Sequence, residues 1–218
     1  MLLHSGDTLL FIGDSITDCG RKRPIGEGVH GALGTGYVAL LGAMLETRSP
    51  HLSCRLVNMG VSGNTSRELL ARWETDVLSQ SAQIVLVMIG INDVWHTFNR
   101  PHQPQTFVSK EEFRDNLKKM AELTLPRVRH MVFISPYFIE PNREEPMRCR
   151  MDEFCCVMKE VAQQYGALFI DTQAAFDRLV PRYYHPSALA WDRVHPTLSG
   201  HLLLAEACFE ALQAAPDT

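Results

Sequence analysis

Ile84-Val-Leu-Val-Met-Ile89, followed at once by Gly90, is the stretch of sequence that decides the fold. All six of its residues are apolar, and most of them are β-branched. An apolar run of this length is too short for a typical helix and predicts a buried strand. Because no polar residue alternates along the run, we expect helices to cover both faces of its sheet.

Four similar short runs lie elsewhere in the chain, at residues 9–12, 55–58, 131–135 and 167–170. Longer segments with helical periodicity lie at about residues 37–47, 66–78, 110–125, 151–165 and 199–213. The alternation is typical of parallel strands joined by right-handed helical crossovers, and no linker or repeat interrupts it. We therefore expect residues 1–218 to form one domain, a three-layer α/β/α sandwich around a five-stranded parallel sheet.

The composition is that of an ordinary globular protein, with 45% hydrophobic and 21% charged residues. A formal net charge of -4 argues against a nucleic-acid partner bound by phosphate neutralisation. No apolar run approaches the roughly 18 residues of a membrane-spanning helix. The N-terminal segment lacks the pattern of a secretory signal, so we expect a cytoplasmic protein. The six cysteines form no C-x-x-C pair, which favours reduced core thiols.

Three of the predicted strands are followed by short segments rich in glycine and polar residues. Ligands of parallel α/β sheets bind beyond the carboxyl ends of the strands, so these segments are candidate site residues. Taken alone, each segment is equally typical of a helix cap or a turn. The segments are Gly13-Asp-Ser15, Gly60-Val-Ser-Gly63 and Gly90-Ile-Asn92-Asp93.

A fourth segment near the C-terminus pairs an acid with a base, Asp192-Arg-Val-His195. Pro181, Pro186 and Pro196 predict that the surrounding chain is not regular helix. The spacing allows the Asp192 carboxylate to reach Nδ1 of His195, which would leave Nε2 free to accept a proton. A solvated loop pair is the alternative for any single D-x-x-H pattern.

Together the four segments predict an acyl-transfer site. Ser15 would attack an ester carbonyl, His195 would act as base and then acid, and Asp192 would orient His195. The backbone N–H groups of Ser15 and Gly63 and the amide of Asn92 would form the oxyanion hole. We expect no cofactor and no metal.

Aromatic residues near this site suggest a sugar substrate, since flat rings suit the apolar faces of sugars. They are Trp95, Tyr184 and Trp191. Buried packing is the alternative role for each, and Trp191, next to Asp192, is the one for which sugar binding is favoured. His201 lies six positions after His195 but has no third ligand placed by the sequence, so we expect a core or surface histidine. Arg21-Lys-Arg23 is typical of a solvated surface.

The four segments resemble the blocks of the SGNH subgroup of the GDSL esterase family, in the same order and after the same strands. The resemblance implies a flavodoxin-like sandwich, a triad of Ser15, Asp192 and His195, and an oxyanion hole completed by Gly63 and Asn92. It is nearest to bacterial intracellular acetylxylan esterases. The segments that carry this closer resemblance are Phe11-Ile-Gly-Asp-Ser-Ile-Thr-Asp-Cys-Gly-Arg21, Gly31-Ala-Leu-Gly-Thr-Gly-Tyr37, Asn92-Asp-Val-Trp95, Asp171-Thr-Gln-Ala-Ala-Phe176 and Ala188-Leu-Ala-Trp-Asp192.

The closer resemblance implies removal of acetyl groups from short xylo-oligosaccharides inside the cell by a homo-oligomeric enzyme. Two alternatives stay open. One is an esterase of the same mechanism that acts on longer acyl chains, such as a lysophospholipase or thioesterase. The other is a carbohydrate-binding module of the same shape without catalysis.

Overall fold

The sheet of the computed structural model has the predicted architecture. Within residues 2–183 and 185–214, which the structure describes, five parallel strands pair in the order β2-β1-β3-β4-β5. The strands are β1 (Thr8–Gly13), β2 (Arg55–Asn58), β3 (Ile84–Met88), β4 (His130–Ile134) and β5 (Leu168–Ile170). Each strand lies within two residues of its predicted bounds, and the α/β fold class is confirmed.

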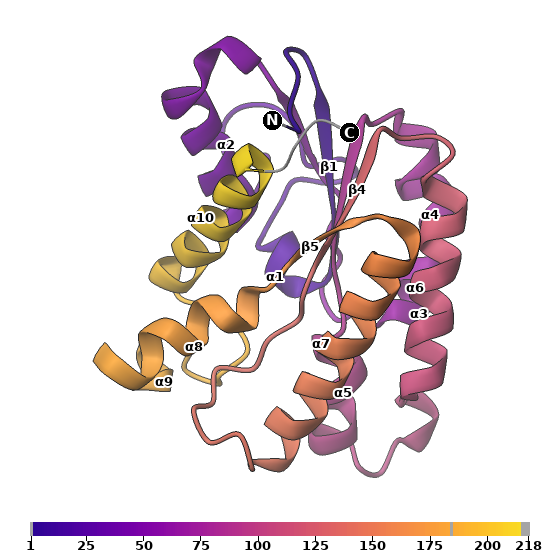
Figure 1. The fold of residues 1–218 in the computed structure, drawn as a ribbon, viewed down its shortest axis with the longest axis vertical. Coiled ribbons are helices and arrows are strands. Elements are labelled where there is room, and N and C mark those ends of the chain that lie inside the picture. The colour runs from indigo at the N-terminus through magenta and orange to yellow at the C-terminus, as the bar shows by residue number, and fades with distance from the viewer. Residues whose placement is uncertain (1, 184, 215–218) are drawn as a thin grey trace.

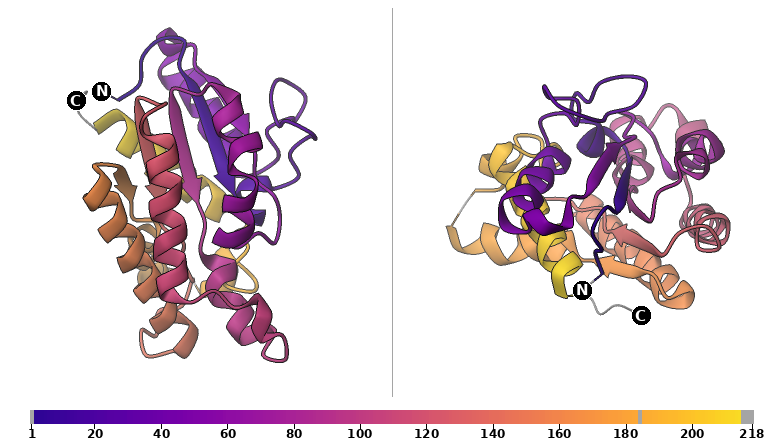
Figure 2. Two further views of the ribbon diagram at one scale, coloured as in Figure 1. Left: turned by 90° about the vertical axis from the view of Figure 1, so that its right-hand side faces the viewer. Right: turned by 90° about the horizontal axis from the view of Figure 1, so that it is seen from above.

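Helices cover both faces of this sheet. Figure 1 shows α2, α8 and α10 on one face and α3, α6 and α7 on the other, and Figure 2 gives the same layers from two further sides. The α-helices are α1 (Ser15–Asp18), α2 (Tyr37–Arg48), α3 (Ser66–Ala71), α4 (Trp73–Asp76), α5 (Ile91–Asn99), α6 (Lys110–Thr124), α7 (Pro146–Tyr165), α8 (Thr172–Tyr183), α9 (Pro186–Leu189) and α10 (Leu198–Ala214). Short 3₁₀ turns are η1 (Pro50–Leu52), η2 (Leu78–Gln80) and η3 (Pro104–Thr106).

The core explains why the central strands are uniformly apolar. Every residue of β1 and β3 is buried, and their side chains join those of the helices in one continuous hydrophobic cluster. Burial on both faces is what the lack of alternation in residues 84–89 predicts. No helix in the described part of the chain is long and apolar enough to cross a membrane.

Two helices have boundaries that differ from the predicted ones. The helix expected over residues 66–78 stops at Arg72, whose backbone (φ -103°, ψ 11°) separates α3 from α4. Helix α7 starts five residues before its expected position. Pro146 is its first residue, a position that proline tolerates well, and the Glu145 side chain accepts a hydrogen bond from the N–H of Arg148.

The expectation of irregular chain around Pro181 and Pro186 is wrong. Helix α8 passes through Pro181 close to its C-terminal end, where a proline need not divide the helix. Pro186 opens the short helix α9, where its fixed φ is suitable. The segment around Pro196 is irregular as expected, because residues 190–197 contain turns and bends but no helix. We call residues 190–197 the acid–base loop.

Candidate active site

The predicted nucleophile lies at the carboxyl end of β1. Ser15 is the first residue of α1, and the Asp14 side chain caps that helix by accepting a hydrogen bond from the N–H of Ile16 at 3.0 Å. Gly13 is the last residue of β1, and a Cβ there would lie 2.2 Å from the carbonyl oxygen of Met88 on β3. Close approach of the neighbouring strand β3 therefore requires the glycine.

The structure brings Ser15, His195 and Asp192 together in a chain of hydrogen-bonding contacts. Oγ of Ser15 lies 3.0 Å from Nε2 of His195, and Nδ1 of His195 lies 2.7 Å from Oδ2 of Asp192. An Nδ1–H that donates to Asp192 leaves Nε2 unprotonated, so Nε2 can accept the proton of the Ser15 hydroxyl. This is the arrangement that activates a serine for attack on an ester.

The Asp192 carboxylate is held in its ionised form. Burial on its own would raise the pKa of Asp192, but hydrogen bonds from the His195 ring and from the N–H groups of His195 and Val194 bring that pKa below its ordinary value. An ionised carboxylate can stabilise the imidazolium that forms when His195 accepts a proton.

The predicted oxyanion donors come from the ends of three adjacent strands. Ser15 follows β1, Gly63 follows β2 and Asn92 lies in α5 after β3. Gly63 adopts a φ of +84°, in the left-handed region, and a Cβ at this position would meet open space. Nδ2 of Asn92 donates to the carbonyl of Asn64 at 2.9 Å, which orients the amide and leaves its second N–H for a substrate.

Two further carboxyl groups flank these residues but are fully enclosed. Burial raises the pKa of Asp14 and of Asp93 to about 7 each. Asp93 accepts hydrogen bonds from the N–H and the hydroxyl of Ser66, which fixes the start of α3. Both side chains accept hydrogen bonds from nearby residues, and neither contacts the triad through a hydrogen bond in the described part of the chain.

The aromatic residues have different positions. The Trp95 ring lies edge-on to the His195 ring, with 5.6 Å between their centroids, and Trp95 also lines a cavity of about 210 Å³ next to Asp192. Trp191 is 78% exposed, so buried packing does not explain it. Tyr184 lies outside the described residues.

Arginines near the site were missed or misread in the sequence. Arg21, which we expected on a solvated surface, is 6% exposed and donates through Nε to the carbonyl of Gly60 at 2.7 Å. Arg23 does reach the surface but pairs with Asp18. Arg72 also donates to backbone carbonyls. Such contacts join residues far apart in sequence and leave no local pattern, so only the folded chain displays them.

His201 is a core histidine, in line with one of the two roles we expected. Its Nδ1 accepts the N–H of Tyr37 at 3.2 Å, and its Nε2 lies 3.4 Å from Sγ of Cys19. The described residues contain no group of three or more side chains suited to a metal ion. The description of the cysteines as core thiols is wrong for most of them, because among the six, all free, only Cys208 is buried.

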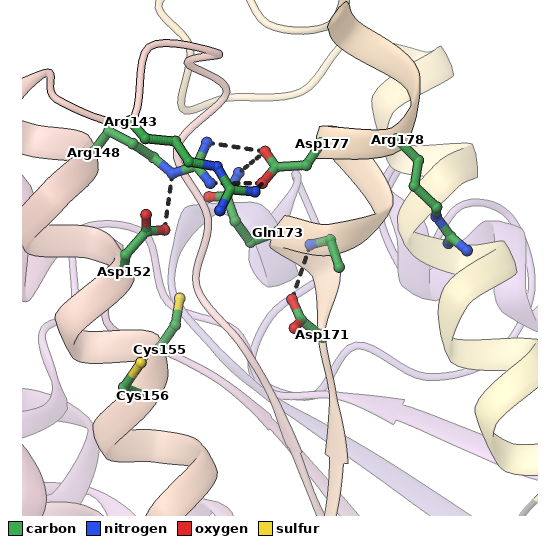
Figure 3. Close-up of a pocket in the computed structure, with 10 residues that line it drawn as sticks. Arg143, Arg148, Asp152, Cys155, Cys156, Asp171, Gln173, Asp177 and Arg178 are labelled. Carbon is green, nitrogen blue, oxygen red and sulfur yellow. Dashed lines mark hydrogen bonds and ion pairs between the residues drawn. The ribbon is translucent and has the colours of Figure 1, made fainter.

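A further cavity lies away from the triad, between α7 and α8. It holds about 560 Å³ and is lined mainly by charged side chains, of which Arg143, Arg148, Asp152 and Asp177 pair with one another (Figure 3). Arg148 is buried there and donates to Asp152 and Asp177. None of the predicted site residues lines this cavity, so its size does not mark the reaction centre.

Known proteins are similar to this chain in sequence and in fold. The model of the GDSL-like Lipase/Acylhydrolase family matches residues 11–203. An acetylxylan esterase of Geobacillus stearothermophilus is 49% identical over 207 residues, covering 95% of this chain and 94% of that protein. The crystal structure of Axe2, an acetylxylan esterase from the same organism, superposes with a TM-score of 0.96 at 47% identity over 99% of this chain and 98% of that chain.

Other solved structures add detail. LAE5, an α/β hydrolase enzyme from the metagenome of Lake Arreo in Spain, has a TM-score of 0.95 at 48% identity over 98% of each chain. Catalytic mutants of Axe2 replace a serine, a histidine and an aspartate by alanine. Axe2 is also known as an acetyl-xylooligosaccharide esterase, in the solved structure of one of its mutants.

Proposed function

The chain belongs to the GDSL-like lipase/acylhydrolase family, and on that premise we propose that it is a serine esterase that removes acetyl groups from acetylated xylo-oligosaccharides. The observation that carries the proposal is the contact chain from Ser15 through His195 to Asp192, with distances of 3.0 and 2.7 Å. The similarity to acetylxylan esterases over nearly the whole chain supports the choice of substrate.

The reaction begins when Oγ of Ser15 attacks the acetyl carbonyl while Nε2 of His195 takes the hydroxyl proton. The carbonyl oxygen becomes negative and is held by the N–H groups of Ser15 and Gly63 and the amide of Asn92. A well-aimed donor of this kind contributes roughly 3 kcal/mol in the transition state. The C–O bond to the sugar then breaks, and His195 returns the proton to the leaving hydroxyl.

Water completes the cycle on the acetyl-serine. His195 now removes a proton from water, the resulting hydroxide attacks the acetyl carbon, and the proton passes to Oγ of Ser15 as acetate leaves. Asp192 stabilises the charged imidazole in both halves of the reaction. Trp95, whose ring lies edge-on to His195, and the exposed Trp191, which directly precedes Asp192, supply apolar surfaces for the sugar.

The direct test measures acetate release from a mixture of acetylated xylo-oligosaccharides. We expect Ser15→Ala and His195→Ala to lower kcat by about 10⁴-fold or more with the fold intact. The exposed Ser79→Ala is the matched control and should retain full activity. Acetate release by folded Ser15→Ala at the wild-type rate would exclude the proposed nucleophile.

Acyl-chain length tests the acetyl preference separately. We expect kcat/KM on nitrophenyl esters to fall from acetate to octanoate, because an acetyl pocket excludes long chains by size. A preference for octanoate would replace the acetyl substrate with a longer acyl group and keep the mechanism.

We further propose that residues 1–218 act as a single domain in the cytoplasm and as a homo-oligomer. The resemblance to intracellular esterases supports the location and the assembly. The exposed apolar side chains of Trp191, Leu198 and Leu202 are surfaces that an oligomer would bury. Sedimentation velocity at micromolar concentration tests the assembly, and a monomer alone would rule it out.

A further inference from the structure

The Arg72 side chain is hydrogen-bonded to three residues next to the candidate active site, Gly13, Met59 and Asn64. This side chain is 17% exposed and lies where the helix breaks between α3 and α4. Nη2 donates to the carbonyl of Gly13 at 3.0 Å, Nη1 to the carbonyl of Met59 at 2.8 Å, and Nε to Oδ1 of Asn64 at 2.7 Å. One planar guanidinium thus spans the ends of β1 and β2.

These acceptors lie next to the groups that carry the chemistry. Gly13 directly precedes Asp14 and Ser15, and Met59 begins the segment that leads to Gly63. Asn64 follows Gly63, and its backbone carbonyl accepts the hydrogen bond that orients the Asn92 amide. Each predicted oxyanion donor is therefore close to an acceptor of Arg72. Ser15 lies two residues after Gly13, Gly63 directly precedes Asn64, and the Asn92 amide is hydrogen-bonded to Asn64.

The guanidinium is itself fixed. Asp76, four residues further along, accepts a hydrogen bond from Nη1 at 2.6 Å. Continuation of α3 through residue 72 would alter the direction of this side chain, so the helix break has a positioning role. A lysine at this position has one nitrogen in place of a planar fork, so it cannot reproduce hydrogen bonds that leave the three separate nitrogen atoms of a guanidinium.

We infer that Arg72 is a positioning residue that holds the nucleophile segment and the oxyanion segment at their working separation. The inference deepens the proposed function and rests on it. Arg72 does not touch the substrate. It acts through the carbonyls of Gly13 and Met59 and through Asn64.

Arg72→Met tests this, because methionine keeps much of the apolar volume and removes every donor. The matched control is Arg129→Met at the amino ends of the strands, away from the site. There Arg129 pairs with Asp7 and donates to the carbonyl of Leu2. We expect Arg72→Met to lower kcat by about a hundredfold with KM changed by less than about threefold, since displacements of about 1 Å can cost that much. Arg129→Met should keep the wild-type kcat.

Affinity for methylboronic acid, whose serine adduct imitates the tetrahedral intermediate, separates positioning from a general loss of stability. We expect that affinity to weaken in Arg72→Met in proportion to kcat and to stay unchanged in Arg129→Met. Wild-type kcat in folded Arg72→Met, equal losses in the two variants, or a kcat loss with unchanged boronate affinity would each overturn the inference.

Amide hydrogen exchange gives a readout that needs no turnover. We expect residues 59–64 and 14–18 to exchange faster in Arg72→Met than in the wild type, with no such change in Arg129→Met. If the wild type failed to hydrolyse esters, the proposed function would fail, and the exchange rates would still decide whether Arg72 holds the two segments. Unchanged exchange in both segments would count against the inference.

Discussion

Arg193 fixes the acid–base loop at the level of a single residue. It lies between Asp192 and His195 with a φ of 65°, in the left-handed region that residues with side chains rarely adopt. Its carbonyl accepts the N–H of Ile139 at 3.0 Å. Its guanidinium lies 4.7 Å from the Phe138 ring centroid and pairs with Glu140. The loop is thus anchored to the segment that follows β4.

Two replacements of Arg193 distinguish the effect of its side-chain contacts from the effect of its positive φ. Arg193→Ala and Arg193→Gly both remove the ring contact and the ion pair, so we expect each to lower kcat by about tenfold through small displacement of His195. Glycine adopts positive φ freely, whereas alanine costs about 1 kcal/mol there. The glycine variant should therefore melt at the higher temperature. Wild-type kcat in both variants would show that the side-chain anchor is not needed.

The link between β3 and α5 shows how one element positions a site residue. Gly90 has a φ of +125°, and a Cβ there would lie 2.9 Å from Cγ of Pro136 and 3.1 Å from Cζ of Phe113. Both the backbone conformation and the close contacts require glycine. Because Asn92 is in the first turn of α5, a shift of this helix moves a predicted oxyanion donor.

Gly90→Ala is expected to destabilise the fold by about 2–3 kcal/mol, as strain and overpacking add, and to lower kcat. Gly166→Ala is the matched control. Gly166 also has a positive φ, at +67°, but a Cβ there meets open space at the end of α7. It should cost about 1 kcal/mol and leave kcat unchanged. Thermal unfolding and nitrophenyl acetate kinetics measure both effects, and equal kcat values in the two variants would contradict the role given to Gly90.

Elements were predictable where the apolar pattern follows burial. The strands satisfy that condition, since β1 and β3 are buried on both faces. Helix α5 was not predicted, although Ile91, Val94, Trp95 and Phe98 recur at helical spacing. The polar residues at its start, Asn92 and Asp93, are buried and are equally typical of a turn that follows a strand. The break at Arg72 also escaped the pattern, because hydrogen bonds to distant carbonyls stabilise it.

Across the whole molecule, the order of motifs predicted which residues meet and the contacts between loops determine how they are held. The rule that carboxyl ends of parallel strands share one edge predicted where Ser15, Gly63 and Asn92 lie. His195, 180 residues from Ser15, lies between α9 and α10, so the D-x-x-H pattern and not a strand end predicted its role. The anchors Arg21, Arg72 and Arg193 could not be found in this way. Each contacts backbone or aromatic groups whose positions follow only from the completed fold.

His201 connects α10 to two other parts of the molecule and makes its stability depend on pH. Nδ1 accepts the N–H of Tyr37 at the start of α2, so that nitrogen cannot carry a proton while the contact persists. Burial, and to a smaller extent the charge of His195, lower the pKa of His201 from 6.5 to about 4. In the unfolded chain the imidazole takes up a proton below its ordinary pKa, while the folded chain keeps it neutral. The stability that neutral His201 contributes is therefore present above pH 6.5 and lost as the pH falls toward 4.

His201→Asn should remove this dependence, because asparagine accepts the Tyr37 N–H without a titrating group. We expect the free energy of unfolding of the wild type to lose up to about 3 kcal/mol more than that of the variant between pH 7 and pH 4. The exposed His102→Asn is the control and should follow the wild type. Asp14 and Asp93, whose pKa values burial raises to about 7, change stability in the opposite direction over this range, but they are common to all three proteins and cancel in the difference. Urea unfolding at a series of pH values measures the difference, and parallel curves for wild type and His201→Asn would show that His201 is not the group responsible.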